Sequence, residues 1–232
     1  MANFFDFSSD QVHVTLMLID SSGSMRDQKS AMKEGLTYYQ KYFEGLPEAN
    51  SMAISNSNFD SDLRLGAFRP LSEFDTSYNT DGWTAIYYAI VQASHHLLNY
   101  MEEVAKKTGI RPQGTLMVFS DGHSEHDRAT FGDAKETVEK LNTAGINTVF
   151  VAFGEAIEEE YGKALGFLAT KDVKDRGALP EFFEEFSEAS RRQSQTRKSL
   201  GANFFSNVQS SSAGYSNRAQ QALEDDSWFD DI

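Results

Sequence analysis

The chain has 232 residues, no cysteine and a formal net charge of −14 at pH 7. The lack of cysteine excludes disulfides, zinc–thiolate sites and thiol catalysis, and the acidic balance argues against binding to nucleic acid, whose backbone requires a basic surface. Because no stretch reaches about 18 consecutive apolar residues and the first residues are neither basic nor strongly apolar, we expect no membrane span, no signal peptide and a cytoplasmic location.

Predicted strands and helices alternate along most of the chain. Nearly continuous apolar runs predict buried parallel strands, and apolar residues spaced three or four apart predict helices. In chain order these patterns predict a strand at 12–20, a helix over 32–43, a hairpin within 51–68, a helix over 85–107, a strand at 115–120, a helix over 134–141 and a strand at 147–153.

The hairpin region has the alternating pattern of strands with one polar face. Met52 and Ile54 alternate with polar residues, residues 60–62 form an Asp-Ser-Asp turn, and the alternation resumes at Leu63. We therefore expect one antiparallel edge strand on an otherwise parallel sheet. The whole succession predicts an α/β fold with a doubly wound, mostly parallel central sheet and helices on both faces, as in Rossmann-like proteins.

The pattern weakens after Phe153. A short helix is expected over 158–167, and Pro180 suits the first turn of another helix that carries a stripe of phenylalanines. From about Ser199 the chain is rich in Gly, Ser, Asn and Gln. We predict a globular domain over 1–199, a flexible linker over 200–222 and an acidic, aromatic tip over 223–232.

Polar residues follow the predicted strands where ligands bind in a doubly wound sheet, at the carboxyl ends of the strands. Asp20, Ser22 and Ser24 follow the first strand, and Asp121 follows the strand at 115–120. Thr84 lies in the loop that comes between these two along the chain, just before the long helix. Carboxylate and hydroxyl oxygens are hard ligands that suit a small divalent cation such as Mg²⁺. These loops are therefore the candidate metal-binding elements.

The set Asp-x-Ser-x-Ser, then Thr, then Asp resembles the complete metal ion-dependent adhesion site (MIDAS) of von Willebrand factor type A (VWA) domains, and the intracellular prokaryotic type of that family. The resemblance implies contact of Mg²⁺, with Mn²⁺ or Ca²⁺ as alternatives, with some of Ser22, Ser24 and Thr84. It also implies that Asp20 and Asp121 bind directly or through water. A protein partner's Asp or Glu then fills an open coordination position, and no bond breaks.

Each motif alone has a simpler interpretation. Asp20 could cap the first helix, and Asp121-Gly122 is an ordinary turn pair. Thr84 suits the N-cap of the long helix, and we expect it to serve as one beside its ligand role. Trp83 is expected to pack around its loop, and His123 and His126 to be exposed rather than to bind zinc.

The main alternative to a binding protein is a magnesium-dependent hydrolase or phosphatase. Ser22 stands where aspartyl phosphatases need a second carboxylate, and the chain has no phosphate-binding P-loop motif, so we predict that it is not an enzyme. The resemblance implies an adaptor that works beside an AAA+ ATPase, or beside a kinase and phosphatase in a stress response. A further alternative makes the acidic tip the docking element and the domain its platform.

Overall fold

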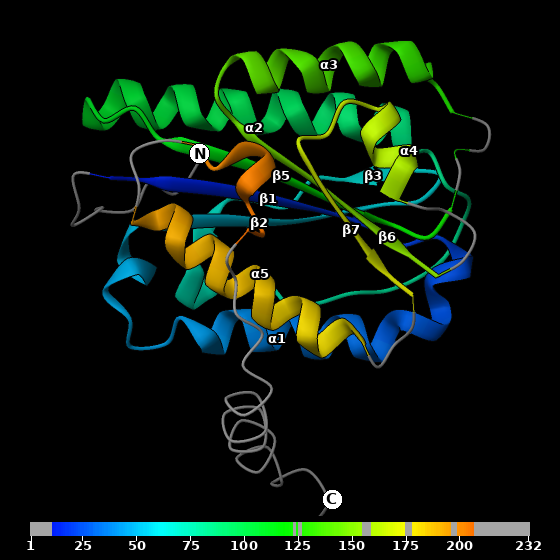
Figure 1. The fold of residues 1–232 in the computed structure, drawn as a ribbon, viewed down its shortest axis with the longest axis horizontal. Coiled ribbons are helices and arrows are strands. Elements are labelled where there is room, and N and C mark those ends of the chain that lie inside the picture. Colours follow the sequence, from blue (N-terminus) through cyan, green and yellow to red (C-terminus); the bar gives the residue numbers. More distant parts are fainter. Residues whose placement is uncertain are drawn as a thin grey trace, which may run out of the picture.

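The computed structural model describes residues 11–122, 124, 127–154, 159–174, 178–195 and 199–206. Its strands are β1 (His13–Asp20), β2 (Met52–Phe59), β3 (Leu63–Arg64), β4 (Arg69–Pro70), β5 (Gln113–Ser120), β6 (Asn147–Phe153) and β7 (Ala169–Val173). They form one seven-stranded sheet in the order β3-β2-β1-β5-β6-β7, and β4 also pairs with β2. The strands that follow β1 in the chain, β2 to β4, lie on one side of it, and β5 to β7 lie on the other side (Figure 1). The carboxyl ends of β1 and β5 therefore form the switch point of the sheet.

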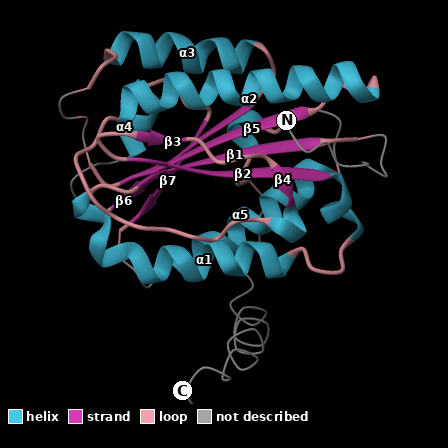
Figure 2. Ribbon diagram, turned by 180° about the vertical axis from the view of Figure 1, so that it is seen from behind, coloured by secondary structure: helices cyan, strands magenta, loops and turns pink. Residues whose placement is uncertain are grey.

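Helices cover both faces of the sheet, as Figures 1 and 2 show. The α-helices are α1 (Lys29–Tyr42), α2 (Ile86–Thr108), α3 (Phe131–Thr143), α4 (Glu159–Ala164) and α5 (Leu179–Ser194). The described residues also form the 3₁₀ helices η1 (Gly23–Gln28), η2 (Pro47–Ser51), η3 (Leu71–Glu73) and η5 (Gly201–Asn203). The predicted doubly wound α/β class is therefore confirmed. Among the described helices, none is both long and apolar enough to cross a membrane.

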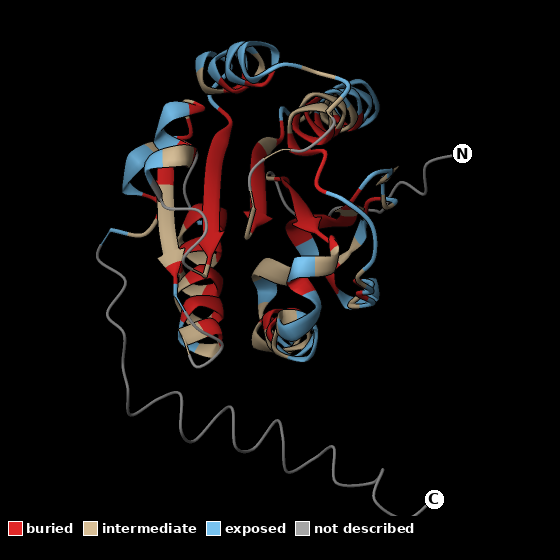
Figure 3. Ribbon diagram, turned by 90° about the vertical axis from the view of Figure 1, so that its right-hand side faces the viewer, coloured by how far each residue is buried: buried red, intermediate tan, exposed pale blue. Residues whose placement is uncertain are grey.

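The central strands are buried on both faces, which explains their continuous apolar sequence. All eight residues of β1 are buried, and β1 pairs in parallel with β2 and β5. One core lies between the sheet and α2, α3 and α4, and the other lies between the sheet and α1 and α5. Figure 3 shows the buried strands enclosed by helices whose outer faces are exposed (Figure 3). This rigid sheet holds the loops at its carboxyl edge.

The predicted hairpin within 51–68 is confirmed, with a difference in detail. β2 pairs in parallel with β1, and the antiparallel edge consists of two short pieces, β3 and β4, that both pair with β2. Three of the four polar residues of β2, Ser55, Asn56 and Ser57, are buried too. Ser55 and Ser57 share a hydrogen bond of 3.0 Å, and Ser55 donates to the carbonyl of Gly66 at 2.9 Å. The alternating pattern thus reflects buried polar pairs instead of an exposed face.

Strand β7 was not expected from the sequence. Its five residues read Ala-Thr-Lys-Asp-Val, and only the first and last are buried. It forms the other edge of the sheet and pairs in parallel with β6. An edge strand with polar residues lacks the apolar run of the inner strands, so local sequence could not identify it.

Residues 199–206 belong to the folded domain, so the predicted linker does not begin at 200. Gly201 donates its backbone N–H to the side-chain oxygen of Asn147 at 2.9 Å. Phe204 is 1 % exposed and its ring centroid lies 6.1 Å from that of Phe186. The two phenylalanines at 204 and 205 bury apolar surface that the polar composition around them conceals. The rest of the linker and the tip lie outside the described residues.

Buried His13 gives the fold a predicted pH dependence. His13 is 4 % exposed at the start of β1, and burial lowers the pKa of its imidazole to about 4. Between pH 4 and the unfolded pKa of about 6.5, the unfolded chain therefore binds more protons, and stability falls as the pH falls. From pH 7 to pH 5 we expect this group to remove about 2 kcal/mol from the free energy of unfolding.

Urea unfolding of the variant His13→Phe measures this contribution. The difference in unfolding free energy between pH 7 and pH 5 should shrink by that amount in the variant. His95→Phe, which replaces an exposed histidine of α2, serves as the control and should keep the wild-type difference. The prediction fails if His13→Phe and wild type lose equal stability over this interval.

Candidate metal centre

Asp20 is the last residue of β1 and is fully buried. One carboxylate oxygen accepts a hydrogen bond from the backbone N–H of Ser22 at 2.9 Å, and the other accepts from the Ser120 hydroxyl at 2.6 Å. Ser120 ends the neighbouring strand β5, so the parallel pairing of β1 and β5 brings it to Asp20. The carboxylate therefore has one fixed orientation at the switch point.

A row of hydrogen-bonded hydroxyls connects the first loop, which follows β1, to the third loop, which follows β5. The side-chain oxygens of Ser22 and Ser24 lie 3.0 Å apart. The hydroxyl of Ser24 donates to a carboxylate oxygen of Asp121 at 2.8 Å. Ser22 is buried and Ser24 is exposed, so the row of oxygens runs from the interior to the surface. These contacts span 97 positions in the chain, and the sheet topology alone accounts for them.

Thr84 lies next to this row of oxygens, in the second loop, which precedes α2. It is 7 % exposed, and a methyl group added to Gly122 would lie 3.7 Å from its hydroxyl oxygen. The second loop is tied to the first by a hydrogen bond of 3.1 Å from the N–H of Gly23 to the carbonyl of Gly82. Gly82 has φ of +80°, and a Cβ there would lie 2.9 Å from the Ser61 hydroxyl, so glycine is required at this turn. The three loops thus bring the five predicted residues to the same edge of the sheet.

Comparison with known proteins identifies the fold. No family model matches the sequence, and no curated protein matches it. Among solved structures, the pilus adhesin SpaC from Lactobacillus rhamnosus GG superposes with a TM-score of 0.61 at 11 % identity, over 77 % of this chain and 30 % of that one. Proximal thread matrix protein 1 from the mussel byssus, with a zinc-occupied MIDAS motif, gives a TM-score of 0.55 at 15 % identity. The fold is VWA-like.

A third solved structure supports the same fold. Manganese-loaded TRAP protein of Plasmodium vivax has a TM-score of 0.50 at 13 % identity, over 73 % of this chain and 71 % of that one. The mussel protein aligns over 73 % of this chain and 45 % of its own length. This chain therefore spans less than half of the adhesin and of the mussel protein. At these identities the likeness is one of fold.

No positively charged side chain pairs with the two carboxylates of the candidate site in the described part of the chain. Burial raises the pKa of Asp20 to about 6, against the opposing hydrogen bonds from Ser120 and Ser22, and the charge of Asp121 raises it further. Burial also raises the pKa of Asp121, despite the hydrogen bond from Ser24. Within the described part of the chain, neither carboxylate has a Lys or Arg ion-pair partner. A cation placed between them would stabilise both ionised forms.

The donor atoms suit a hard cation. The five side chains offer two carboxylates and three hydroxyls, and no imidazole or thiol. The described residues contain no group of three or more His, Cys, Asp or Glu that could hold a metal, so the candidate site depends on its hydroxyls as well as its two carboxylates. Oxygen-only donors favour Mg²⁺, Mn²⁺ or Ca²⁺. His123 and His126 lie outside the described residues.

The N-terminus of α2 is capped by Asp127 and not by Thr84, which corrects one expectation. Ala85 is the N-cap residue and gives no side-chain bond. The carboxylate of Asp127, from the loop before α3, accepts from the backbone N–H of Tyr87 at 2.6 Å and of Tyr88 at 2.9 Å. The Thr84 hydroxyl is thus not used as a cap, and Asp127 joins the third loop to the second. Local sequence could not reveal a cap 40 positions away.

Asp127→Ala is expected to have two effects. Loss of the cap should cost about 1–2 kcal/mol of stability. Loss of the link between the loops should weaken metal binding by about tenfold, in the range usual for residues that orient metal ligands. Chemical unfolding and calorimetric titration with Mg²⁺ measure the two effects.

Asp133→Ala is the matched control, because Asp133 caps α3 through Thr130 and contacts none of the five site residues. It should lose comparable stability and keep the affinity for Mg²⁺. Equal affinities in Asp127→Ala and Asp133→Ala would show that the cap across the loops does not position the site.

Two supporting residues were missed in the sequence, and a third was misjudged. Tyr78 donates its hydroxyl to the backbone carbonyl of Asp20, and Ser120 orients the carboxylate. A polar residue at the end of an apolar strand was the available signal for Ser120. Trp83, expected to pack around its loop, is 62 % exposed next to Thr84. The candidate site therefore has a large aromatic side chain at its rim.

Proposed function

We propose that this chain is a member of the VWA family whose MIDAS binds Mg²⁺ and, through it, a carboxylate of a protein partner. The observation that supports the proposal best is the convergence of five oxygen-bearing side chains from three loops, around two carboxylates that have no cationic partner among the described residues. Solved structures of the same fold include a zinc-occupied MIDAS and a manganese-loaded protein. Those two proteins support a divalent cation at this position; the choice of Mg²⁺ rests on the oxygen-only donors.

The residues of the chain have separate roles in this proposal. Ser22, Ser24 and Thr84 would contact the cation, with Asp20 and Asp121 balancing its charge directly or through water. A bound Mg²⁺ supplies a coordination position that accepts an Asp or Glu oxygen. The hydrogen bonds of Asp20 to Ser22 and Ser120 hold its carboxylate in place before a cation arrives. This preorganisation reduces the ordering cost of binding.

An exposed aromatic side chain at the rim of the site offers the partner an apolar contact, in addition to the metal that binds the partner's carboxylate. Trp83 is the most exposed of the large apolar side chains in the described residues. An indole beside a metal favours a partner segment with an apolar residue close to its acidic residue, because large aromatic side chains are frequent anchors of interfaces. We therefore propose that the partner presents an acidic residue next to an apolar one.

The enzyme alternative has weaker support. A serine nucleophile needs a neighbouring base. In the described residues the hydroxyl of Ser24 contacts that of Ser22 and donates to the carboxylate of Asp121, and no histidine or lysine side chain contacts either hydroxyl. We propose binding without turnover, and a panel of phosphoesters tested with Mg²⁺ separates the two classes. Hydrolysis that Asp121→Asn abolishes would favour the enzyme.

The proposal is tested by capturing partners from the native cell on the immobilised full chain. Proteins captured with Mg²⁺ and released by EDTA are expected with wild type. Asp121→Asn removes one charge of the site and should capture none of them, whereas Asp62→Asn, an exposed carboxylate outside the site, should capture the same set. Capture that is indifferent to EDTA and to Asp121→Asn would refute metal-dependent binding.

Several finer expectations stay predictions. The AAA+ ATPase, or kinase and phosphatase, as partner rests on the family resemblance, and the cytoplasmic location rests on sequence composition. The acidic tip over 223–232 lies outside the described residues, so its role as an alternative docking element also stays a prediction.

A further inference from the structure

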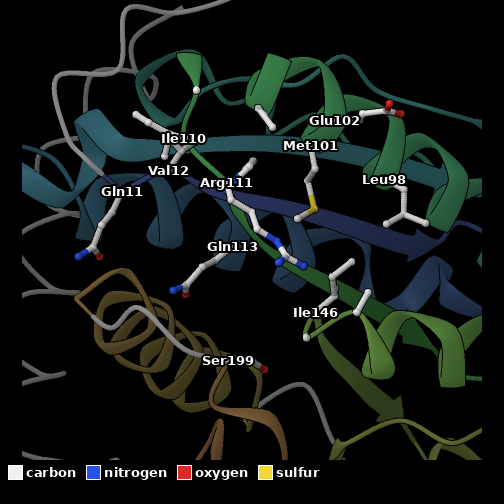
Figure 4. A pocket seen from close by; sticks show the side chains of 16 residues that line it. Gln11, Val12, Leu98, Met101, Glu102, Ile110, Arg111, Gln113, Ile146 and Ser199 are labelled. Atoms are coloured by element: carbon white, nitrogen blue, oxygen red, sulfur yellow. The ribbon is translucent and has the colours of Figure 1, made fainter. Parts of the chain in front are cut away.

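A second surface lies at the opposite edge of the sheet from the metal centre. A pocket of about 870 Å³ opens where β1 and β5 begin, between the C-terminal half of α2 and the loop before β6. Its apolar wall consists of Leu98, Met101, Ile110 and Ile146. Figure 4 shows the side chains of Met101 and Arg111 extending towards its middle. The volume lies in the range of roughly 300–1,000 Å³ that is usual for ligand pockets.

The pocket exposes apolar surface that a folded domain normally covers. Leu98 is 38 % exposed, whereas Met101, about one turn further along α2, is partly buried against the core. The pocket wall also carries two charged side chains, Glu102 and Arg111. Glu102 is already paired with Lys106 at 2.6 Å, whereas Arg111 has no carboxylate partner among the described residues, so Arg111 supplies a positive charge. The pocket thus suits an occupant that is apolar and carries one acidic group.

The chain itself supplies such an occupant directly at the wall. Gln11 lines the pocket and is preceded by residues 1–10, which include Phe4, Phe5 and Phe7 with Asp6 between them. At about 3.3 Å per residue, an extended chain places Phe7 and Phe4 within about 13 and 23 Å of Gln11. A tether this short gives a local concentration of at least about millimolar.

We propose that the N-terminal segment Phe4–Phe7 docks into this pocket in the same chain, with phenylalanine rings against Leu98 and Met101 and the Asp6 carboxylate near Arg111. The proposal goes beyond the metal centre and does not depend on it. The segment acts as an internal ligand of a pocket that none of the five candidate metal-binding residues lines.

The absence of cysteine permits a direct test by cross-linking. Two double variants are compared: Phe5→Cys with Leu98→Cys, and Phe5→Cys with Phe131→Cys. Leu98 and Phe131 are almost equally exposed, at 38 % and 37 %, but Phe131 begins α3 at the carboxyl edge, in contact with Tyr87. Under mild oxidation the first pair should form an intramolecular disulfide at least tenfold faster than the second, detected by mobility on a non-reducing gel.

Thermal unfolding gives a second, independent reading. The triple variant Phe4→Ala, Phe5→Ala and Phe7→Ala should lower Tm by roughly 5 °C, from the loss of buried aromatic surface. The control Asn3→Ala, Ser8→Ala and Ser9→Ala changes polar neighbours of the same segment and should leave Tm unchanged. Equal Tm values for the two triple variants would overturn the proposal. So would a disulfide that forms equally in both pairs, in neither pair, or between two chains.

Discussion

Asp20→Asn is expected to abolish the stabilisation of this protein by Mg²⁺. In wild type, Mg²⁺ at a hundredfold excess over its dissociation constant should add about 2.7 kcal/mol to the free energy of unfolding, a rise in Tm of roughly 5–10 °C. Asparagine keeps the size of the side chain and an acceptor oxygen for Ser22 or Ser120, but it removes the buried charge that attracts the cation. Differential scanning calorimetry with Mg²⁺ and with EDTA measures the change.

Without metal, the same substitution should not lower the stability of the fold. Burial raises the pKa of Asp20 to about 6, so its ionised form destabilises the metal-free fold at pH 7. With EDTA, Asp20→Asn should therefore be at least as stable as wild type, by up to about 2–3 kcal/mol. Asp62→Asn, whose carboxylate is 73 % exposed, serves as the control and should follow wild type in both conditions. An Mg²⁺-induced rise in Tm that is equal in Asp20→Asn and wild type would remove Asp20 from the site.

Gly35→Ala is expected to produce the largest loss of stability in the fold itself. Gly35 lies on α1 where that helix meets α5, and a Cβ there would lie 2.1 Å from two ring atoms of Phe183. Phe183 is fully buried, so its ring cannot turn into solvent. We expect a destabilisation of about 2–3 kcal/mol from overpacking, measured by urea unfolding.

Gly132→Ala on α3 is the matched control for this substitution. The nearest atom to a Cβ at Gly132 is the Thr130 hydroxyl, at 3.6 Å, which is an ordinary contact. Alanine there should stabilise the helix, by up to about 1 kcal/mol. The double variant Gly35→Ala with Phe183→Leu should recover part of the loss, because leucine leaves room for the methyl group. Additive effects of the two substitutions would contradict the proposed clash.

Local sequence determined the elements whose signal lies in neighbouring residues. The strands β1, β5 and β6 were predicted because both their faces are buried, which gives continuous apolar runs. Helices α1, α2 and α3 were predicted from their repeating apolar positions. The candidate site was predicted as well, because Asp20, Ser22 and Ser24 share one loop, and Asp121 directly follows a recognisable strand.

Only the tertiary structure decided the features that depend on distant contacts. Strand β7 pairs at an edge and needs no apolar run. Asp127 caps a helix that begins far earlier in the chain, Trp83 stays exposed at the rim, and Phe204 extends the domain past residue 200. The physical reason is common to all four. Each feature depends on whether a segment distant in the sequence packs against the residue. The spacing of residues along the chain does not indicate which distant segments will pack there.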